Sequence, residues 1–381
     1  MLLEMKEFIK KETVFCAAAF LAVISAFLVP PSMEYFSYID YKTLALLFCL
    51  MSVVAGLQSI GVFDRLGKLL LSKAGGTRAL GILLVMACFF SSMLITNDVA
   101  LITFVPFTIL VYRMVGKEER LIKVIVLETI AANLGSMATP VGNPQNLYLY
   151  SVSGISAADF FASVLPYAGL AFVLLLAVLL LERNETIEYR ESESESGMEA
   201  SSADTGKLQR GKLTAYLILF AVCLLVVAHL LPWQAALAAV LLWMITEDRK
   251  LFAGADYFLL LTFVCFFVFI GNMKHLESVS LFLEQLIQGH ELLTGILASQ
   301  VISNVPAAIL LSGFTGEYQT LLTAVNLGGL GTLIASLASL ISFKAYTREY
   351  GNKKGRYFTQ FTLWNLAFLV VLAADAALLA V

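Results

Sequence analysis

Long apolar runs, separated by short polar windows, make up most of this chain. The runs cover approximately residues 14–29, 44–60, 79–95, 99–111, 121–150, 160–181, 213–231, 233–245, 257–270, 292–302, 305–313, 321–343 and 357–381. Apolar runs of roughly 20 residues are typical of helices that cross a bilayer. The pattern therefore predicts an all-α integral membrane protein.

Two adjacent pairs of runs predict helical hairpins, over 79–112 and 291–313. The arms of the second pair have about 11 and 9 residues, or about 14–17 Å as helices. Because a hydrocarbon core is about 30 Å thick, these arms are too short to cross, and the hairpin is expected to re-enter. The arms of the first pair are longer, and charge alone does not exclude two full crossings there.

Two other runs, 121–150 and 320–343, predict discontinuous helices. The first contains SMATPVGNPQN, which places Pro140, Gly142 and Pro144 in the middle of an apolar run. Proline removes a backbone donor and disrupts the helix. The second run contains the flexible stretch GGLGTLIASLAS, although small residues also suit a helix-packing face. Irregular backbone at membrane depth is tolerated where it lines protein or a wet cavity.

Positive charge predicts the topology. Six windows hold 23 of the 25 Lys and Arg residues, and only Lys42 and Lys274 lie elsewhere. Placing all six in the cytoplasm gives nine crossings plus two hairpins, with the N-terminus cytoplasmic and the C-terminus outside. The Ser- and Glu-rich stretch 182–212 is predicted to be a disordered cytoplasmic linker between halves 1–181 and 213–381.

Three sequence blocks recur in the same order in both halves, which predicts an internal repeat. LLFCLMSVVAG resembles LTFVCFFVFIG, ITNDVALI resembles ISNVPAAI, and NLGSMATPVGNPQNLYLY resembles NLGGLGTLIASLASLISF. Five crossings separate the copies, so the second copy is expected to be inverted relative to the first.

The hairpin tips and helix breaks carry the polar residues expected to form the site. Helix ends at mid-membrane attract anions through N–H groups and cations through carbonyl and side-chain oxygens. The candidate substrate-binding residues are Thr96, Asn97, Ser303, Asn304, Thr139 and Thr332. The candidate ion-coupling residues are Asp98, Asn133, Gly135, Asn143, Asn146, Asn326, Gly328 and Ser336.

Asp98 is the most informative acid because no basic residue is near it in sequence. A carboxyl at this depth can carry a proton or bind Na⁺ as an oxygen ligand. A partnered structural acid is the alternative. Glu128 lies two turns before the first break and is a second candidate relay.

Composition excludes several classes of function. The chain is 59% hydrophobic and 14% charged, against about 25% charged residues in typical soluble domains. A net charge of −3 indicates no nucleic-acid partner. No HExxH or GxxxxGK[ST] motif occurs, so neither an enzyme nor a transport ATPase is expected. No Cys/His metal spacing is found, and no cofactor is expected apart from a coupled Na⁺.

The motifs ITNDVALITFVPF, NLGSMATPVGNPQN, SNVPAA and NLGGLGTLIASLAS resemble those of the ion transporter superfamily. This group includes arsenite-efflux permeases, divalent-anion/sodium symporters, citrate transporters and a class of Na⁺/H⁺ antiporters. The resemblance covers nearly the whole chain and is strongest for the arsenite-permease-like branch. It implies two scaffold bundles, two hairpins, two discontinuous helices, a homodimer and elevator-like movement.

The sequence thus predicts a multi-pass secondary active transporter of the plasma membrane. Its substrate is expected to be a small inorganic or organic anion or oxyanion, coupled to H⁺ or Na⁺. A Na⁺/H⁺ antiporter that uses Asp98 as its cation carrier is the first alternative. A channel-like anion permease is the second.

Overall fold

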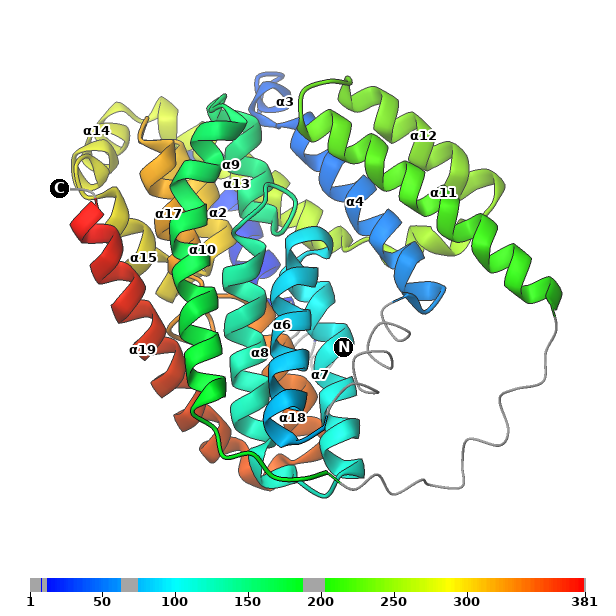
Figure 1. Ribbon diagram of the computed structural model, residues 1–381. Helices are drawn as coiled ribbons and strands as arrows, with labels where there is room; N and C mark the ends of the chain where they lie inside the picture. The colour runs from blue at the N-terminus through cyan, green and yellow to red at the C-terminus, as the bar shows by residue number, and fades with distance from the viewer. Residues whose placement is uncertain (1–7, 9–11, 63–74, 188–202, 380–381) are drawn as a thin grey trace.

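The computed structural model describes residues 8, 12–62, 75–187 and 203–379 (Figure 1). Every regular element in these ranges is a helix. The longer helices are α2 (Thr13–Leu28), α4 (Tyr41–Ser59), α6 (Thr77–Ile95), α7 (Asn97–Met114), α8 (Leu121–Ser136), α9 (Pro144–Ser153), α10 (Ala157–Leu180), α11 (Ala203–Val227), α12 (Trp233–Thr246), α13 (Tyr257–His275), α14 (Glu277–Ile287), α15 (Glu291–Ile302), α16 (Asn304–Ser312), α17 (Tyr318–Leu327), α18 (Leu337–Glu349) and α19 (Lys354–Leu379). This confirms the predicted all-helical class.

Seven helices in the described ranges are long and apolar enough to cross a membrane. Five of them, α4, α10, α11, α13 and α19, match predicted crossings, while the predicted crossings α2 and α12 are shorter apolar helices. The other two are α6 and α7, with 19 and 18 residues, so length alone allows the arms of the first hairpin to cross. The arms of the second hairpin, α15 and α16, have only 12 and 9 residues.

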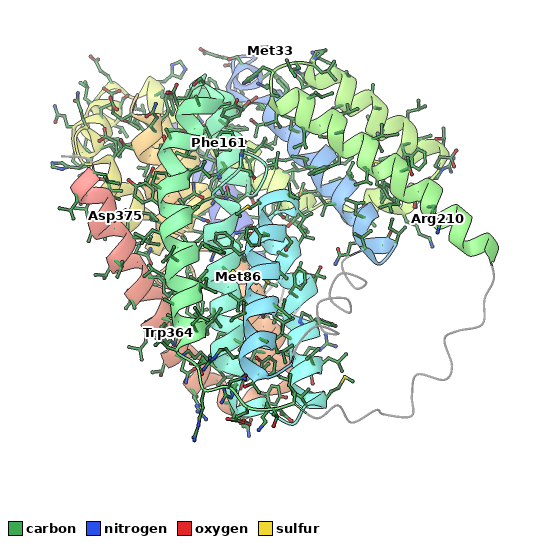
Figure 2. The ribbon with its side chains drawn as sticks, in the orientation of Figure 1. Met33, Met86, Phe161, Arg210, Trp364 and Asp375 are labelled. Carbon is green, nitrogen blue, oxygen red and sulfur yellow. The ribbon has the colours of Figure 1, made fainter. Side chains whose placement is uncertain are left out.

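Large apolar side chains cover the outward faces of these helices (Figure 2). Phe20 and Phe27 on α2, Leu242 on α12, and Leu363 and Val370 on α19 are all more than half exposed. Soluble monomers rarely expose apolar surface on this scale. The exposed faces therefore suit contact with lipid.

The helices pack in two groups (Figure 1). One contains both hairpins and both broken helices, with α10 and α19 packed against them, and we call it the core group (α6–α10 and α15–α19). The other contains α2, α4, α11, α12 and α13, and we call it the flanking group. The groups meet where α9 packs on α4 and α16 packs on α13. The Tyr148 ring of α9 also lies 6.0 and 5.6 Å from Phe263 and Phe267 of α13.

The two hairpins open toward opposite ends of the molecule. The open end of α6–α7, which carries Arg78 and Arg113, lies at the lower edge of Figure 1, whereas α15 begins beside α14 at the upper edge. Sequence analysis missed α14 and the short helix α3 (Tyr35–Tyr38) because each is short and lies in a window of mixed polarity.

The first residues of the predicted linker are bound to the core group. Lys117 and Arg120 each place a nitrogen 2.5 Å from a carboxylate oxygen of Glu185, and Glu182 pairs with Lys123. The Thr77 N–H also donates to the Glu185 carbonyl at 2.9 Å. Helix α11 begins at Ala203, within the stretch expected to be disordered, and 188–202 lie outside the described residues.

This ion-pair cluster predicts an acid-dependent stability. Hydrogen bonds from Lys117 and Arg120 hold the pKa of Glu185 below its ordinary value of 4.5. A carboxyl whose pKa is lower in the folded state stabilises the fold above its unfolded pKa, and that stabilisation disappears as pH falls through the folded pKa. Glu185→Gln should therefore lower the melting temperature in detergent at neutral pH, and the difference from wild type should shrink in acid. Glu119→Gln, at a neighbouring exposed acid, serves as the control; an equal pH dependence for both variants would contradict the assignment.

Gly135 lets α6 and α8 approach closely. A Cβ at this position would lie 2.2 Å from the Phe89 carbonyl oxygen and 2.7 Å from the Ser92 Oγ. Overpacking of this kind typically costs about 1–3 kcal/mol. Gly135→Ala should therefore lower the melting temperature clearly, whereas Gly169→Ala on α10, where no atom lies within 4 Å, should not. Equal melting temperatures for the two variants would show that α6 and α8 can move apart at little cost in stability.

Candidate functional site

Each hairpin turns at one residue with a left-handed backbone. Thr96 has φ 70° and ψ 149°, and Ser303 has φ 74° and ψ 154°. A positive φ is uncommon outside glycine, especially for a β-branched residue, and such strain costs of order 1–3 kcal/mol. Strained residues of this kind concentrate at functional sites. The two tips thus share an unusual conformation that nothing in their apolar arms requires.

Each tip is hydrogen-bonded to the broken helix of its own half. The Asn97 N–H donates to the Gly142 carbonyl at 3.1 Å, and the Asn304 N–H donates to the Ala335 carbonyl at 2.9 Å. In the register that aligns Asn133 with Asn326, Gly142 and Ala335 are equivalent positions. The first backbone N–H after each turn therefore donates to an equivalent carbonyl in each half.

A threonine in each break makes a second equivalent contact. The Thr139 hydroxyl donates to the Met93 carbonyl, and the Thr332 hydroxyl donates to the Gln300 carbonyl at 3.2 Å. Met93 and Gln300 each lie three residues before the strained turn. Two of the three predicted substrate-binding threonines, Thr139 and Thr332, thus connect a hairpin to a break, and Thr332 is also exposed.

The asparagine and proline of the first break determine where α9 begins. The Asn143 Oδ1 accepts the Asn146 N–H at 2.9 Å, which is an N-cap, and Pro144 occupies the first helical position. Proline is well tolerated there because the first helical N–H groups have no partner within the helix. The sequence signal read as a helix break is therefore also the start signal of the next helix.

Asn133 connects the first tip to the second break. Its Oδ1 accepts from the Asn97 Nδ2 at 3.0 Å and from the Ser336 Oγ at 2.9 Å. Each of the three residues is at most 4% exposed. The Asn133 Nδ2 is buried and has no partner in the described structure. A buried amide donor without a partner is costly, so this group is available to a ligand oxygen.

A second network centres on Asn326 and again joins the two halves. Its Oδ1 accepts from the Asn143 Nδ2 at 3.0 Å, and its Nδ2 donates to the Asn146 Oδ1 at 2.6 Å. All three side chains are buried. Five of the predicted ion-coupling residues therefore belong to two networks that cross between the breaks: Asn133, Asn143, Asn146, Asn326 and Ser336.

Other predicted residues lie near these networks without joining them. Ser303 and Asn304 are buried, and the Ser303 Oγ lies 3.4 Å from the Ala335 carbonyl oxygen. Asp98 is half-buried in the first turn of α7, and its carboxylate has no hydrogen bond or ion pair with a described residue. Gly135 and Gly328 lie where a Cβ would meet the adjacent hairpin arm.

Two residues of the site were missed by sequence analysis. The Ser136 Oγ accepts from the Asn143 Nδ2 at 3.2 Å and so supports the second network. Gln300 satisfies the second break: its Nε2 donates to the Gly328 and Leu330 carbonyls at 2.8 and 2.9 Å, and its Oε1 accepts the Thr332 N–H at 2.9 Å. The repeat register, which places Gln300 opposite Met93, was the available signal for its importance.

The site offers amide, hydroxyl and carbonyl groups. In the described parts of the chain, no group of three or more His, Cys, Asp or Glu residues could hold a metal ion. None of the network side chains is hydrogen-bonded to a Lys, Arg or His of the described ranges. Such a set can hydrogen-bond a small polar solute, and its oxygens can ligate an alkali cation.

Comparison with known proteins places the chain among membrane transporters. The model of the citrate transporter family matches residues 1–317. An uncharacterized transporter of Methanocaldococcus jannaschii is 30% identical over 90% of this chain and 91% of its own length. The inner membrane protein YbiR of Escherichia coli is 32% identical over 88% and 90%. A silicon efflux transporter of Oryza sativa is 33% identical over 38% of this chain and 30% of its own.

These matches confirm the resemblance found from the sequence motifs. The family match covers both hairpins and the first break, and two of the relatives align over nearly their full lengths. The chain belongs to the citrate transporter family and is a multi-pass membrane transporter.

Proposed function

We propose that this transporter moves a small inorganic or organic anion or oxyanion across the plasma membrane, driven by an H⁺ or Na⁺ gradient. One observation carries the proposal. The Asn133 side chain binds a tip residue of its own half and a break residue of the other half, deep inside the molecule. Buried polar groups at membrane depth are costly and typically serve transport.

The two tips are proposed to be re-entrant and to belong to inverted repeats. The matched turns at Thr96 and Ser303 and the matched tip–break bonds support two copies of one unit. The hairpins also open toward opposite ends of the molecule (Figure 1). With the basic ends in the cytoplasm, the N-terminus is cytoplasmic and the C-terminus lies outside.

Alternating access is proposed to follow an elevator path. All the site residues belong to the core group, which meets the flanking group through α9 and α16. The core group can therefore carry the site as a unit, past the aromatic contact of Tyr148 with Phe263 and Phe267. We propose a homodimer in which the flanking groups of the two subunits contact each other. The flanking groups would then stay in place while each core group moves.

The names of relatives suggest the substrate classes to test. The family is named for citrate, and the partial match in Oryza sativa is named for silicon efflux. A site whose network side chains are not hydrogen-bonded to a Lys, Arg or His of the described residues suits a weakly charged or hydroxylated solute better than a trianion. A Na⁺/H⁺ antiporter that uses Asp98 is the second candidate, favoured because no described residue pairs with this carboxylate, which follows the first tip.

Transport in proteoliposomes tests the proposal. The purified protein should accumulate one member of a panel of arsenite, silicate, phosphate, sulfate, citrate and succinate, with H⁺ and Na⁺ gradients imposed separately. An antiporter would instead collapse a pH gradient when Na⁺ is added without any anion. Conductance that neither saturates nor shows exchange would indicate a channel and overturn the proposal.

A further inference from the structure

Glu128 is a completely buried acid in the middle of α8. Its Oε1 accepts from the Thr108 hydroxyl at 2.5 Å, and its Oε2 is buried with no partner. No Lys, Arg or His of the described residues is paired with it. One hydroxyl cannot replace the hydration of an ionised carboxylate, so this position favours the uncharged acid.

The fold itself does not need an acid at this position. In the register that aligns Asn133 with Asn326, the equivalent of Glu128 is Leu321, which is also completely buried. A leucine therefore packs in the matching place of the second half. An acid retained at a cost in the first half only is explained more readily by function than by packing.

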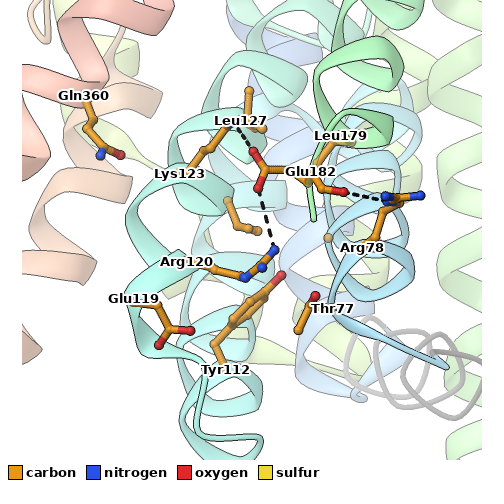
Figure 3. Close-up of a pocket in the computed structure, with 12 residues that line it drawn as sticks. Thr77, Arg78, Tyr112, Glu119, Arg120, Lys123, Leu127, Leu179, Glu182 and Gln360 are labelled. Atoms are coloured by element: carbon orange, nitrogen blue, oxygen red, sulfur yellow. Dashed lines mark hydrogen bonds and ion pairs between the residues drawn. The ribbon is translucent and has the colours of Figure 1, made fainter. Parts of the chain in front are cut away.

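A pocket of about 170 Å³ lies at the basic end of the molecule, and its wall includes Leu127, the residue before Glu128 (Figure 3). Arg120, Lys123 and Glu182 lie in its wall, as do Tyr112 and Val124, and Val124 is one helical turn before Glu128 on α8. The wall also includes Gln360 of α19, whose Oε1 is buried without a partner. A pocket of this size with charged side chains in its wall can hold water.

The ionisable groups around Glu128 come from three neighbouring helices. A charge on it would act on Cys88 of α6, Tyr112 of α7 and Tyr357 of α19. The Tyr357 side chain is completely buried, and its ring stacks on Tyr346 of α18. The basic side chains Arg120 and Lys123 lie farther down α8, in the pocket wall, and are already paired with Glu182.

Glu128 lies between the pocket residues and the site along the axis of α8. Val124, in the pocket wall, precedes it by four residues, and Asn133 follows it by five, about 7–8 Å along the axis.

We propose that Glu128 is a proton-binding site separate from the tips, loaded through the pocket lined by Tyr112, Val124 and Gln360. The proposal rests on the proposed function in that the bound proton would be used in transport. The proton moves between water in the pocket and the free Oε2, and Thr108 keeps the carboxyl oriented.

Carbodiimide labelling tests the proposal without requiring transport. Dicyclohexylcarbodiimide, an apolar reagent, adds to a protonated carboxyl in lipid and rearranges to a stable N-acylurea with no leaving group. In proteoliposomes of the full chain, mass spectrometry of peptides should find the adduct on Glu128, forming faster in mildly acidic than in mildly alkaline buffer. No adduct at any pH, or a rate independent of pH, would overturn the proposal.

Transport by Glu128→Gln gives the second measurement. This variant keeps an oxygen for the Thr108 hydroxyl, so a purely structural acid predicts wild-type behaviour. We expect substrate exchange across the membrane to continue while accumulation no longer responds to a pH gradient. Thr108→Val, which keeps the carboxyl, should retain that response with a shifted pH profile.

The two proposals fail separately. If wild type transports nothing in the panel, the proposed function fails while labelling still decides the state of Glu128. If Glu128→Gln still accumulates substrate in response to a pH gradient, the Glu128 proposal fails and the transporter function stands.

Discussion

Replacing Asp98 with asparagine is expected to abolish gradient-driven accumulation of the substrate and to leave the protein folded. Asp98 directly follows the first tip, is half-buried, and has no hydrogen bond or ion pair to its carboxylate among the described residues. Asparagine has nearly the same shape, so packing should be retained, while the charge that holds a proton or Na⁺ is lost. Accumulation in proteoliposomes and size-exclusion profiles of the purified variant measure the two effects.

Asp375→Asn is the matched control. Asp375 also lies inside an apolar run, but near the end of α19 and far along the chain from both tips (Figure 2). We expect it to transport as wild type does, and Asp98→Glu to recover part of the activity. Wild-type accumulation by Asp98→Asn would remove Asp98 from the mechanism.

Asn133→Ala is expected to slow the initial rate of transport by about 100-fold. The change deletes two buried hydrogen bonds, each worth about 1–1.5 kcal/mol, and about 2.8 kcal/mol corresponds to a factor of about 100. It also leaves the Asn97 amide and the Ser336 hydroxyl without their acceptor, so tip and break lose their connection. Initial uptake rates, normalised to the amount of folded protein, measure the effect.

A second buried asparagine provides the control for this variant. Asn365 on α19 is completely buried, and its amide donates only within its own helix, to the Phe361 carbonyl at 2.9 Å. Asn365→Ala should therefore cost some stability and little transport. Equal transport rates for the two variants would show that the loss of any buried asparagine slows transport, and that the Asn133 contacts have no special role.

Local sequence signals account for the helix ends at Asn97, Asn304 and Pro144. Asn97 and Asn304 begin their helices where polar residues interrupt an apolar run, and α9 begins at Pro144 because Asn143 caps it. These signals depend on neighbouring residues in the sequence, so they can be recognised without knowing any tertiary contact. The family resemblance depended on the same motifs.

The partners of the site residues could not be predicted in this way. That Asn133 binds Ser336, and Asn143 binds Asn326, follows from how the two breaks pack across the halves. Ser136 and Gln300 were missed because a single serine or glutamine in an apolar run carries no periodic signal. Re-entrance of the first hairpin also stays a prediction, since α6 and α7 are each long enough to cross.

The glycines of the breaks determine how closely the chain packs around them. A Cβ at Gly135 or Gly142 would strike a backbone carbonyl oxygen, of Phe89 or Ser136. At Gly328 a Cβ would lie 2.7 Å from the Ser299 Cβ and 2.9 Å from the Ala324 carbonyl oxygen, whereas at Gly331 the three nearest atoms all belong to the Gln300 side chain. Any side chain at the first three positions would therefore push main-chain or Cβ atoms apart. Only at Gly331 could a neighbouring side chain turn aside, and there the φ of 104° itself requires glycine.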